Sequence, residues 1–169
     1  KMIEMAAEYG DGVIFNLWPK AALPKMMEHV AIGAARAGKK AEDVEIVNRA
    51  MVLATDDKVA GRNLFRAAFA PYYATPVYNK FLAWAGYEDA AAAITEGWAE
   101  KNREKTTGAL TDEMIDEIAI IGTEDEIRER IQSDADGGVH TSIIAPLAAS
   151  AEDLQRTFDA FRADVFQFR

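Results

Sequence analysis

The sequence predicts an α/β fold in which parallel strands alternate with helices. Three short runs rich in apolar and β-branched residues, at residues 12–17, 44–54 and 141–145, are typical of buried strands. The segments around them carry apolar residues at helical spacing, so the order is helix, strand, helix, strand, several helices, strand and helix. Strands that are joined through helices pair in parallel through right-handed crossovers.

Local signals mark where the helices begin and end. A helical pattern occupies residues 111–121. Thr123 and Glu126 have the spacing of a capping box, and Ser150 suits the N-cap of the last helix. Between the second and third strand runs, residues 72–120 form a long helical insertion.

The composition favours an acidic, globular, cytoplasmic protein. The 169 residues include 19 basic and 28 acidic side chains, which give a net charge of −9. A chain of this charge is not expected to bind nucleic acid, because phosphate-backbone binding needs a basic surface. No apolar run is long enough to suggest a membrane span, and no secretory signal is visible. The chain has no cysteine, so disulfides and cysteine nucleophiles are excluded.

Three parallel strands are too few to close a sheet. A sheet of this size would leave two open edges, which natural folds usually avoid. The chain also begins inside a helical pattern rather than before a strand. We therefore expect residues 1–169 to form a single partial domain, made of consecutive units of a larger parallel sheet or barrel.

Several phrases, in order along the chain, resemble the C-terminal half of luciferase-like monooxygenases, and in particular the branch that uses the deazaflavin coenzyme F-420. The matching phrases are "KMIEMAAEYGDGVIFNLWP", "AIGAARAGKKAEDVEI", "LATDDKVAGRNLFRAAFAPYY", "LTDEMIDEIAIIGTEDEIRERI" and "GGVHTSIIAP". The resemblance implies the C-terminal part of a (β/α)8 TIM barrel, with residues 12–17, 44–54 and 141–145 as its sixth, seventh and eighth strands.

The resemblance also implies a cofactor and a site. The cofactor would be coenzyme F-420 or FMN, the substrate a small molecule, and the reaction an oxidoreduction. Relatives bind the cofactor phosphate at the loop before the first helix of this chain, which leaves Lys1 and Met2 as cofactor-binding candidates. The residues that relatives place against the flavin ring belong to earlier strands, so the catalytic residues of this chain are unknown.

Barrel enzymes build their sites at the C-terminal ends of the strands. Asn16 and Trp18 follow the first strand run, and Arg49 lies within the second, where it either faces the barrel interior or makes an outer ion pair. Tyr73 and Tyr78 belong to an aromatic stretch of the insertion, where the family tends to carry a lid. These five residues are the substrate and rim candidates. Their alternative roles are structural: strand capping, loop packing, core or subunit interface.

No metal site is expected, because His29 and His140 have no partner at ligand spacing. Three functions remain open. The chain supplies one wall and the lid of an oxidoreductase site, or it is an inert half-barrel that pairs with itself or with a missing half, or it belongs to another phosphate-binding barrel enzyme. By itself the chain is expected to be inactive, because three of eight strands supply only part of a barrel site.

Overall fold

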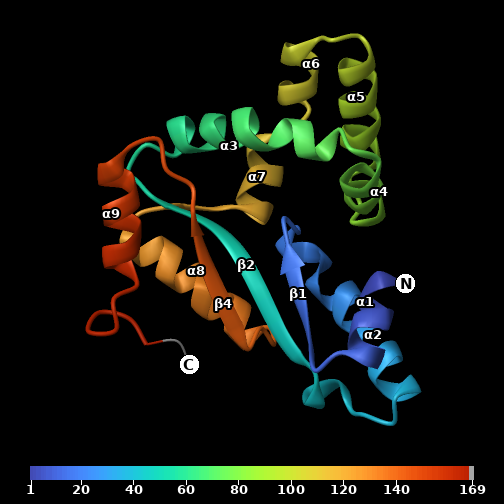
Figure 1. Ribbon diagram of the computed structural model, residues 1–169. Helices are drawn as coiled ribbons and strands as arrows, with labels where there is room; N and C mark the ends of the chain where they lie inside the picture. The colour runs from blue at the N-terminus through green and yellow to red at the C-terminus, as the bar shows by residue number, and fades with distance from the viewer. Residues whose placement is uncertain (168–169) are drawn as a thin grey trace.

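The computed structural model describes residues 1–167, and a parallel sheet forms its centre (Figure 1). In this part of the chain the sheet has four strands. They are β1 (Gly12–Asn16), β2 (Glu45–Ala54), β3 (Ile120–Gly122) and β4 (Thr141–Pro146). Strand β2 pairs in parallel with each of the other three.

Strand β2 is bonded along both edges, and β1 and β3 share one of them. Residues 45–49 of β2 pair with β1, and residues 52–54 pair with β3. The opposite edge pairs with β4 over residues 47–52. Backbone hydrogen bonds distinguish the two edges. On one edge, Glu45 N donates to Asp11 O and Thr55 N donates to Gly122 O. On the other edge, His140 N donates to Ile46 O and Leu147 N donates to Val52 O. The sheet is therefore three strands wide, with β3 continuing the line of β1.

Helices cover the two faces of the sheet differently. The outer face is covered by α1 (Met2–Tyr9), α2 (Leu23–Arg36), α8 (Glu124–Asp136) and α9 (Ala151–Ala160) (Figure 1). The opposite face, which we call the inner face, is covered near the C-terminal ends of the strands by the insertion. The insertion contains α3 (Lys58–Tyr73), α4 (Pro76–Trp84), α5 (Glu88–Ala99), α6 (Arg103–Gly108) and α7 (Asp112–Ile118). Short 3-10 helices occupy Lys20–Ala22 and Ala41–Asp43.

The predicted helix starts are confirmed. The hydroxyl of Thr123 caps α8, and the carboxylate of Glu126 accepts from the backbone N–H of Thr123 at 2.9 Å. Ser150 begins α9 in the same way, with Asp153 completing a second capping box. Such reciprocal caps satisfy backbone donors that the first turn of a helix leaves free.

The prediction of a helix over residues 111–121 is wrong at the C-terminal end of the helix. Helix α7 stops at Ile118, and Ile120–Gly122 is a strand instead. Beyond Asn16 the edge of β2 would have no strand partner, and β-branched Ile120 and Ile121 supply one. Tertiary hydrogen bonding thus overrides the helical pattern, and about three expected strands become four.

The inner face is open where the insertion does not reach. Ile14 is 66% exposed and Ile143 is 44% exposed, although both lie within strands. Within residues 1–167, the outer edges of β1 and β4 have no strand partner. The sheet therefore leaves one apolar surface and two edges uncovered. No helix among these residues is long and apolar enough to cross a membrane.

Gly33 allows α1 and α2 to pack closely, which predicts a large effect of a single methyl group. A Cβ at this position would lie 2.1 Å from the carbonyl oxygen of Glu4. We expect Gly33→Ala to lower the free energy of unfolding by about 1–3 kcal/mol in urea denaturation, because the helices must separate. The control is Gly108→Ala, where a Cβ meets nothing within 4 Å. Equal effects of the two variants would contradict the close approach.

Candidate functional site

Three side chains meet on the inner face, at the C-terminal end of β1. Arg49 Nη1 donates to Asn16 Oδ1 at 3.2 Å, and Asn16 Nδ2 donates to the Tyr78 hydroxyl at 3.1 Å. Asn16 and Arg49 are paired positions of adjacent strands, so they point to the same face. Tyr78 comes from α4 of the insertion. We call these three residues the rim cluster; it joins two strands to the insertion.

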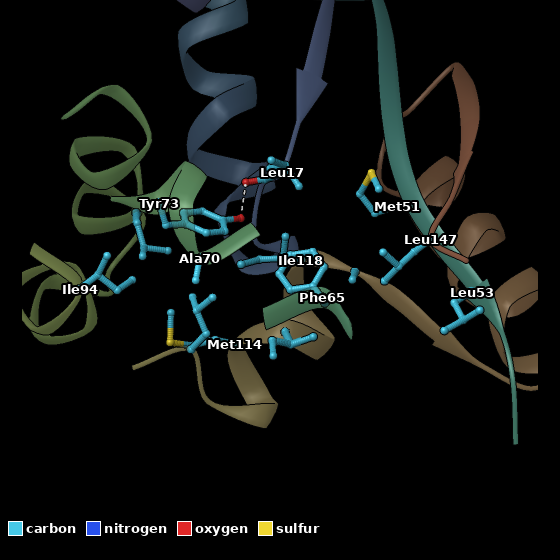
Figure 2. Close-up of a cluster of buried hydrophobic side chains, with 14 of the residues drawn as sticks. Leu17, Met51, Leu53, Phe65, Ala70, Tyr73, Ile94, Met114, Ile118 and Leu147 are labelled. Carbon is cyan, nitrogen blue, oxygen red and sulfur yellow. Dashed lines mark hydrogen bonds between the residues drawn. The ribbon is translucent and has the colours of Figure 1, made fainter. Parts of the chain in front are cut away.

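Tyr73 supports this cluster from below rather than facing solvent. Its side chain is fully buried, and its hydroxyl donates to the carbonyl oxygen of Leu17 at 3.2 Å (Figure 2). Its ring lies edge-on to that of Tyr78, with centroids 6.2 Å apart. Burial raises the pKa of Tyr73 well above its usual range, so the hydroxyl stays protonated and keeps donating.

Strand β1 ends at Asn16, one residue before the predicted end at Leu17. The φ of Leu17 is +52°, in the left-handed region that a leucine rarely adopts. The bond from Tyr73 and burial of the Leu17 side chain in the insertion core hold this conformation (Figure 2). Strained backbone of this kind often accompanies functional sites, and here it separates the directions of Asn16 and Trp18.

Trp18 points away from the rim cluster and into the outer layer. It is 4% exposed, and its indole N–H donates to Asn48 Oδ1 at 2.9 Å. Asn48 Nδ2 in turn donates to Asp134 Oδ2 at 3.3 Å, and Arg130 Nε donates to Asp134 Oδ1 at 3.1 Å. The network fastens the end of β1 to β2 and α8. Trp18 therefore positions the rim in this structure and does not line it.

Asp134 is the charged centre of this buried network. Burial raises its pKa, while the charge and hydrogen bond of Arg130 oppose the rise. Asn48 also acts against the rise, by donating to the carboxylate. The Asn48 amide thus serves two buried polar groups at once.

Lys1 and Met2 lie at the N-terminus of α1, which runs antiparallel to β1. That terminus therefore lies toward the same end of the sheet as Asn16 (Figure 1). Lys1 is the N-cap residue but makes no side-chain capping bond, so the first-turn N–H groups of α1 have no such acceptor. The Glu4 carboxylate in this turn is held by hydrogen bonds from His29 and Arg36, which lower its pKa.

Arg49 carries the charge of the rim cluster. Among the described residues it has no carboxylate partner; its contacts are Asn16 and the sulfur of Met51, 3.4 Å from Nη1. An unbalanced guanidinium at the end of parallel strands suits an anionic or carbonyl-bearing ligand. The contact between Arg49 and Met51 was not predicted from the sequence, because Met51 offers no signal beyond an apolar strand position.

Comparisons with known proteins identify the family of the chain. The chain belongs to the luciferase-like monooxygenase family, whose model matches residues 1–141. A 5,10-methylenetetrahydromethanopterin reductase of Archaeoglobus fulgidus is 32% identical over 149 residues, which cover 86% of this chain and 45% of the relative. A putative coenzyme F-420-dependent oxidoreductase of Mycobacterium tuberculosis is 25% identical over 167 residues, covering 92% and 46%. The chain thus spans about half the length of these relatives.

Solved structures show the same fold. A coenzyme F-420-dependent tetrahydromethanopterin reductase from Methanopyrus kandleri superimposes with a TM-score of 0.70 at 18% identity, over 95% of this chain and 48% of that one. A coenzyme F-420-dependent secondary alcohol dehydrogenase gives 0.66 at 14% identity, over 98% and 46%. The expected fold class, the C-terminal part of a (β/α)8 barrel, is confirmed.

The buried network predicts a pH-dependent loss of stability in Asn48→Ala. The variant leaves the Trp18 N–H without its acceptor and removes a donor from Asp134. We expect the free energy of unfolding to fall by about 1–3 kcal/mol at pH 7. The loss should become smaller as the pH falls, because the raised pKa of Asp134 lets its carboxyl take up a proton in the folded state at a higher pH than a free aspartate does.

Urea denaturation at pH 7 and at pH 4 measures this difference. The control is Asn63→Ala on the exposed side of α3, which should stay within about 0.5 kcal/mol at either pH. A loss for Asn48→Ala that is the same at pH 4 and pH 7 would contradict the coupling to Asp134.

Proposed function

We propose that this chain is the C-terminal half of a deazaflavin-dependent oxidoreductase barrel and that it forms one wall and the lid of the cofactor and substrate site. The observation that carries the proposal is the rim cluster of Asn16, Arg49 and Tyr78. It lies on the inner face at the C-terminal end of β1, and barrel enzymes assemble their sites at the C-terminal ends of strands. Family membership supports the reaction class, and the relatives named for coenzyme F-420 support this cofactor over FMN.

The residues present suit a cofactor with an anionic part and a polar ring. Arg49 has no acidic partner among the described residues, so its charge is available to such a group. The uncapped N-terminus of α1, with Lys1 and Met2, offers backbone N–H groups and a positive dipole end to a phosphate. When bound, coenzyme F-420 supplies hydride transfer, and the protein binds, orients and shields it.

The lid would act through Tyr78. This side chain is half-buried, and it connects α4 to Asn16 by one hydrogen bond. A ligand that competes for the Asn16 amide would break that bond and release the Tyr78 side chain, while buried Leu82 keeps α4 in place. Tyr73 would stay fixed, because it is fully buried and bonded to Leu17. Tyr78 therefore becomes the residue that shapes access for a small-molecule substrate.

Arg49 provides the direct test of the cofactor proposal. In a complete barrel that contains this chain, we expect Arg49→Gln to weaken coenzyme F-420 binding by about tenfold, the loss of one charge-assisted hydrogen bond. Fluorescence titration measures the dissociation constant. Arg162→Gln is the matched control, because Arg162 is exposed and pairs with nearby Asp164.

Three outcomes of this titration count against the proposal. Failure of the unmodified complete barrel to bind coenzyme F-420 would refute the cofactor assignment. Tighter binding of FMN than of coenzyme F-420 would make FMN the cofactor and contradict the choice of coenzyme F-420. Saturable phosphate binding without either flavin would favour another phosphate-binding barrel enzyme.

The second candidate is an inert half-barrel that associates through its inner face. It is supported by the exposure of Ile14 and Ile143 and by the unpaired edges of β1 and β4 in residues 1–167. Apolar strand surfaces with free edges promote pairing with another chain. The partner would be the missing half or a second copy. A cytoplasmic location, expected from the composition, stays a prediction.

This candidate predicts that a charge on the inner face prevents assembly. We expect the chain alone to exceed its monomer mass in light scattering, and Ile14→Lys to return it to the monomer mass, because a buried lysine opposes sheet pairing. Val59→Lys is the control, since Val59 is 64% exposed on α3. A monomer for the unmodified chain, or equal effects of the two variants, would contradict assembly through this face.

A further inference from the structure

A second concave site lies in the insertion, apart from the rim cluster. A cavity of about 500 Å³ opens between α3, α5 and α6. No rim-cluster residue lines it. On α3, Pro71 lines the cavity, whereas Tyr73 packs against Tyr78 of the rim cluster; at 100° per residue these two side chains point some 160° apart. The residues that line the cavity are Ala67, Ala70, Pro71, Gly97, Trp98, Lys101, Asn102, Arg103, Thr106 and Thr107.

The helices around this cavity leave a backbone acceptor in its wall. Pro71 lies inside α3 and has no N–H, so the carbonyl of Ala67 lacks the donor that a helix normally supplies four residues later. Both residues line the cavity. Small side chains at Ala67 and Ala70 keep the space open, while Gly97 lets α5 approach α6 closely: a Cβ there would lie 2.7 Å from Thr106 Oγ1.

The open side of the cavity combines an aromatic surface with two cations. Trp98 is 53% exposed, which is unusual for an indole. Lys101 and Arg103 also line the cavity, and neither has an acidic partner among residues 1–167. The nearby acids Glu96 and Glu100 are both held by Lys105.

We propose that this cavity binds a small aromatic anion, a mono- or bicyclic carboxylate or sulfonate. The ring would stack on Trp98 against the apolar wall, and the anionic group would meet Lys101 and Arg103. A hydroxyl or N–H on the ligand could donate to the carbonyl of Ala67, which receives no N–H from Pro71. The volume suits such a molecule. Because the two sites share no residue, this proposal stands independently of the proposed function.

The test compares 1-naphthoate with its neutral isostere 1-naphthalenemethanol, by calorimetry and tryptophan fluorescence. Trp18 is buried and Trp84 is partly buried, so Trp98 is the most accessible of the three tryptophans. We expect saturable binding of the naphthoate and weaker binding of the alcohol. Lys101→Gln and Arg103→Gln should each weaken naphthoate binding by about 2- to 5-fold and leave the alcohol unchanged.

Two further variants keep the proposal falsifiable. Trp98→Leu should weaken both probes by about 3- to 10-fold, and Ala67→Trp should abolish binding by filling the cavity. Lys80→Gln, an exposed cation of α4 that does not line the cavity, is the matched control. Circular dichroism verifies that each variant is folded. The proposal is overturned if naphthoate does not bind saturably, if both probes bind equally well, or if Lys80→Gln weakens binding as much as Lys101→Gln.

Discussion

Strand β2 is hydrogen-bonded along its whole length, and this pairing fixes the sheet on which the helices of both faces pack. One edge holds β1 and then β3, and the other holds β4. With both edges paired, β2 presents its alternate side chains to two different environments. Ala50 and Val52 pack under α8 and α9, while Met51 and Leu53 pack under the insertion.

The same alternation divides two adjacent polar residues between two tasks. Asn48 faces the outer layer, where it bonds Trp18 and Asp134 in a buried network. Arg49 faces the inner side, where it meets Asn16 beside the open part of the sheet. In a buried network each polar group needs a hydrogen-bond partner from the protein. An exposed cation can keep hydrogen-bond donors that are not bonded to protein and that a ligand can use. Buried and exposed polar side chains are therefore separated by a single step along the strand.

The insertion makes a partial barrel into a structure with a core of its own. Its helices bury Leu82 as well as Phe65 and Tyr73, which Figure 2 labels. They cover the C-terminal ends of the strands (Figure 1). In the middle of β1 and β4, Ile14 and Ile143 stay exposed on the inner face, and Ile143 is the pairing position of Arg49. The sheet is thus packed where the insertion covers it and open on the inner face beside the rim cluster.

The sequence by itself determined the strand runs, the capping boxes at Thr123 and Ser150, and the family, because these depend on residues close together in the chain. It also identified the rim candidates Asn16, Arg49 and Tyr78, but not their contact. Their meeting joins residues 62 positions apart through packing of the insertion on the sheet. The direction of Trp18 was equally out of reach, since it depends on the left-handed turn at Leu17.

Tertiary structure also decided the strand at Ile120–Gly122 and the cavity beside Trp98. The strand forms because β2 offers an unpaired edge beyond β1, a demand that no local pattern records. The cavity forms because Pro71 and small residues from three helices come together. The preference of a segment for helix or strand depends on neighbouring residues. The pairing of a strand edge and the shape of a cavity depend on distant segments that meet only in the folded chain.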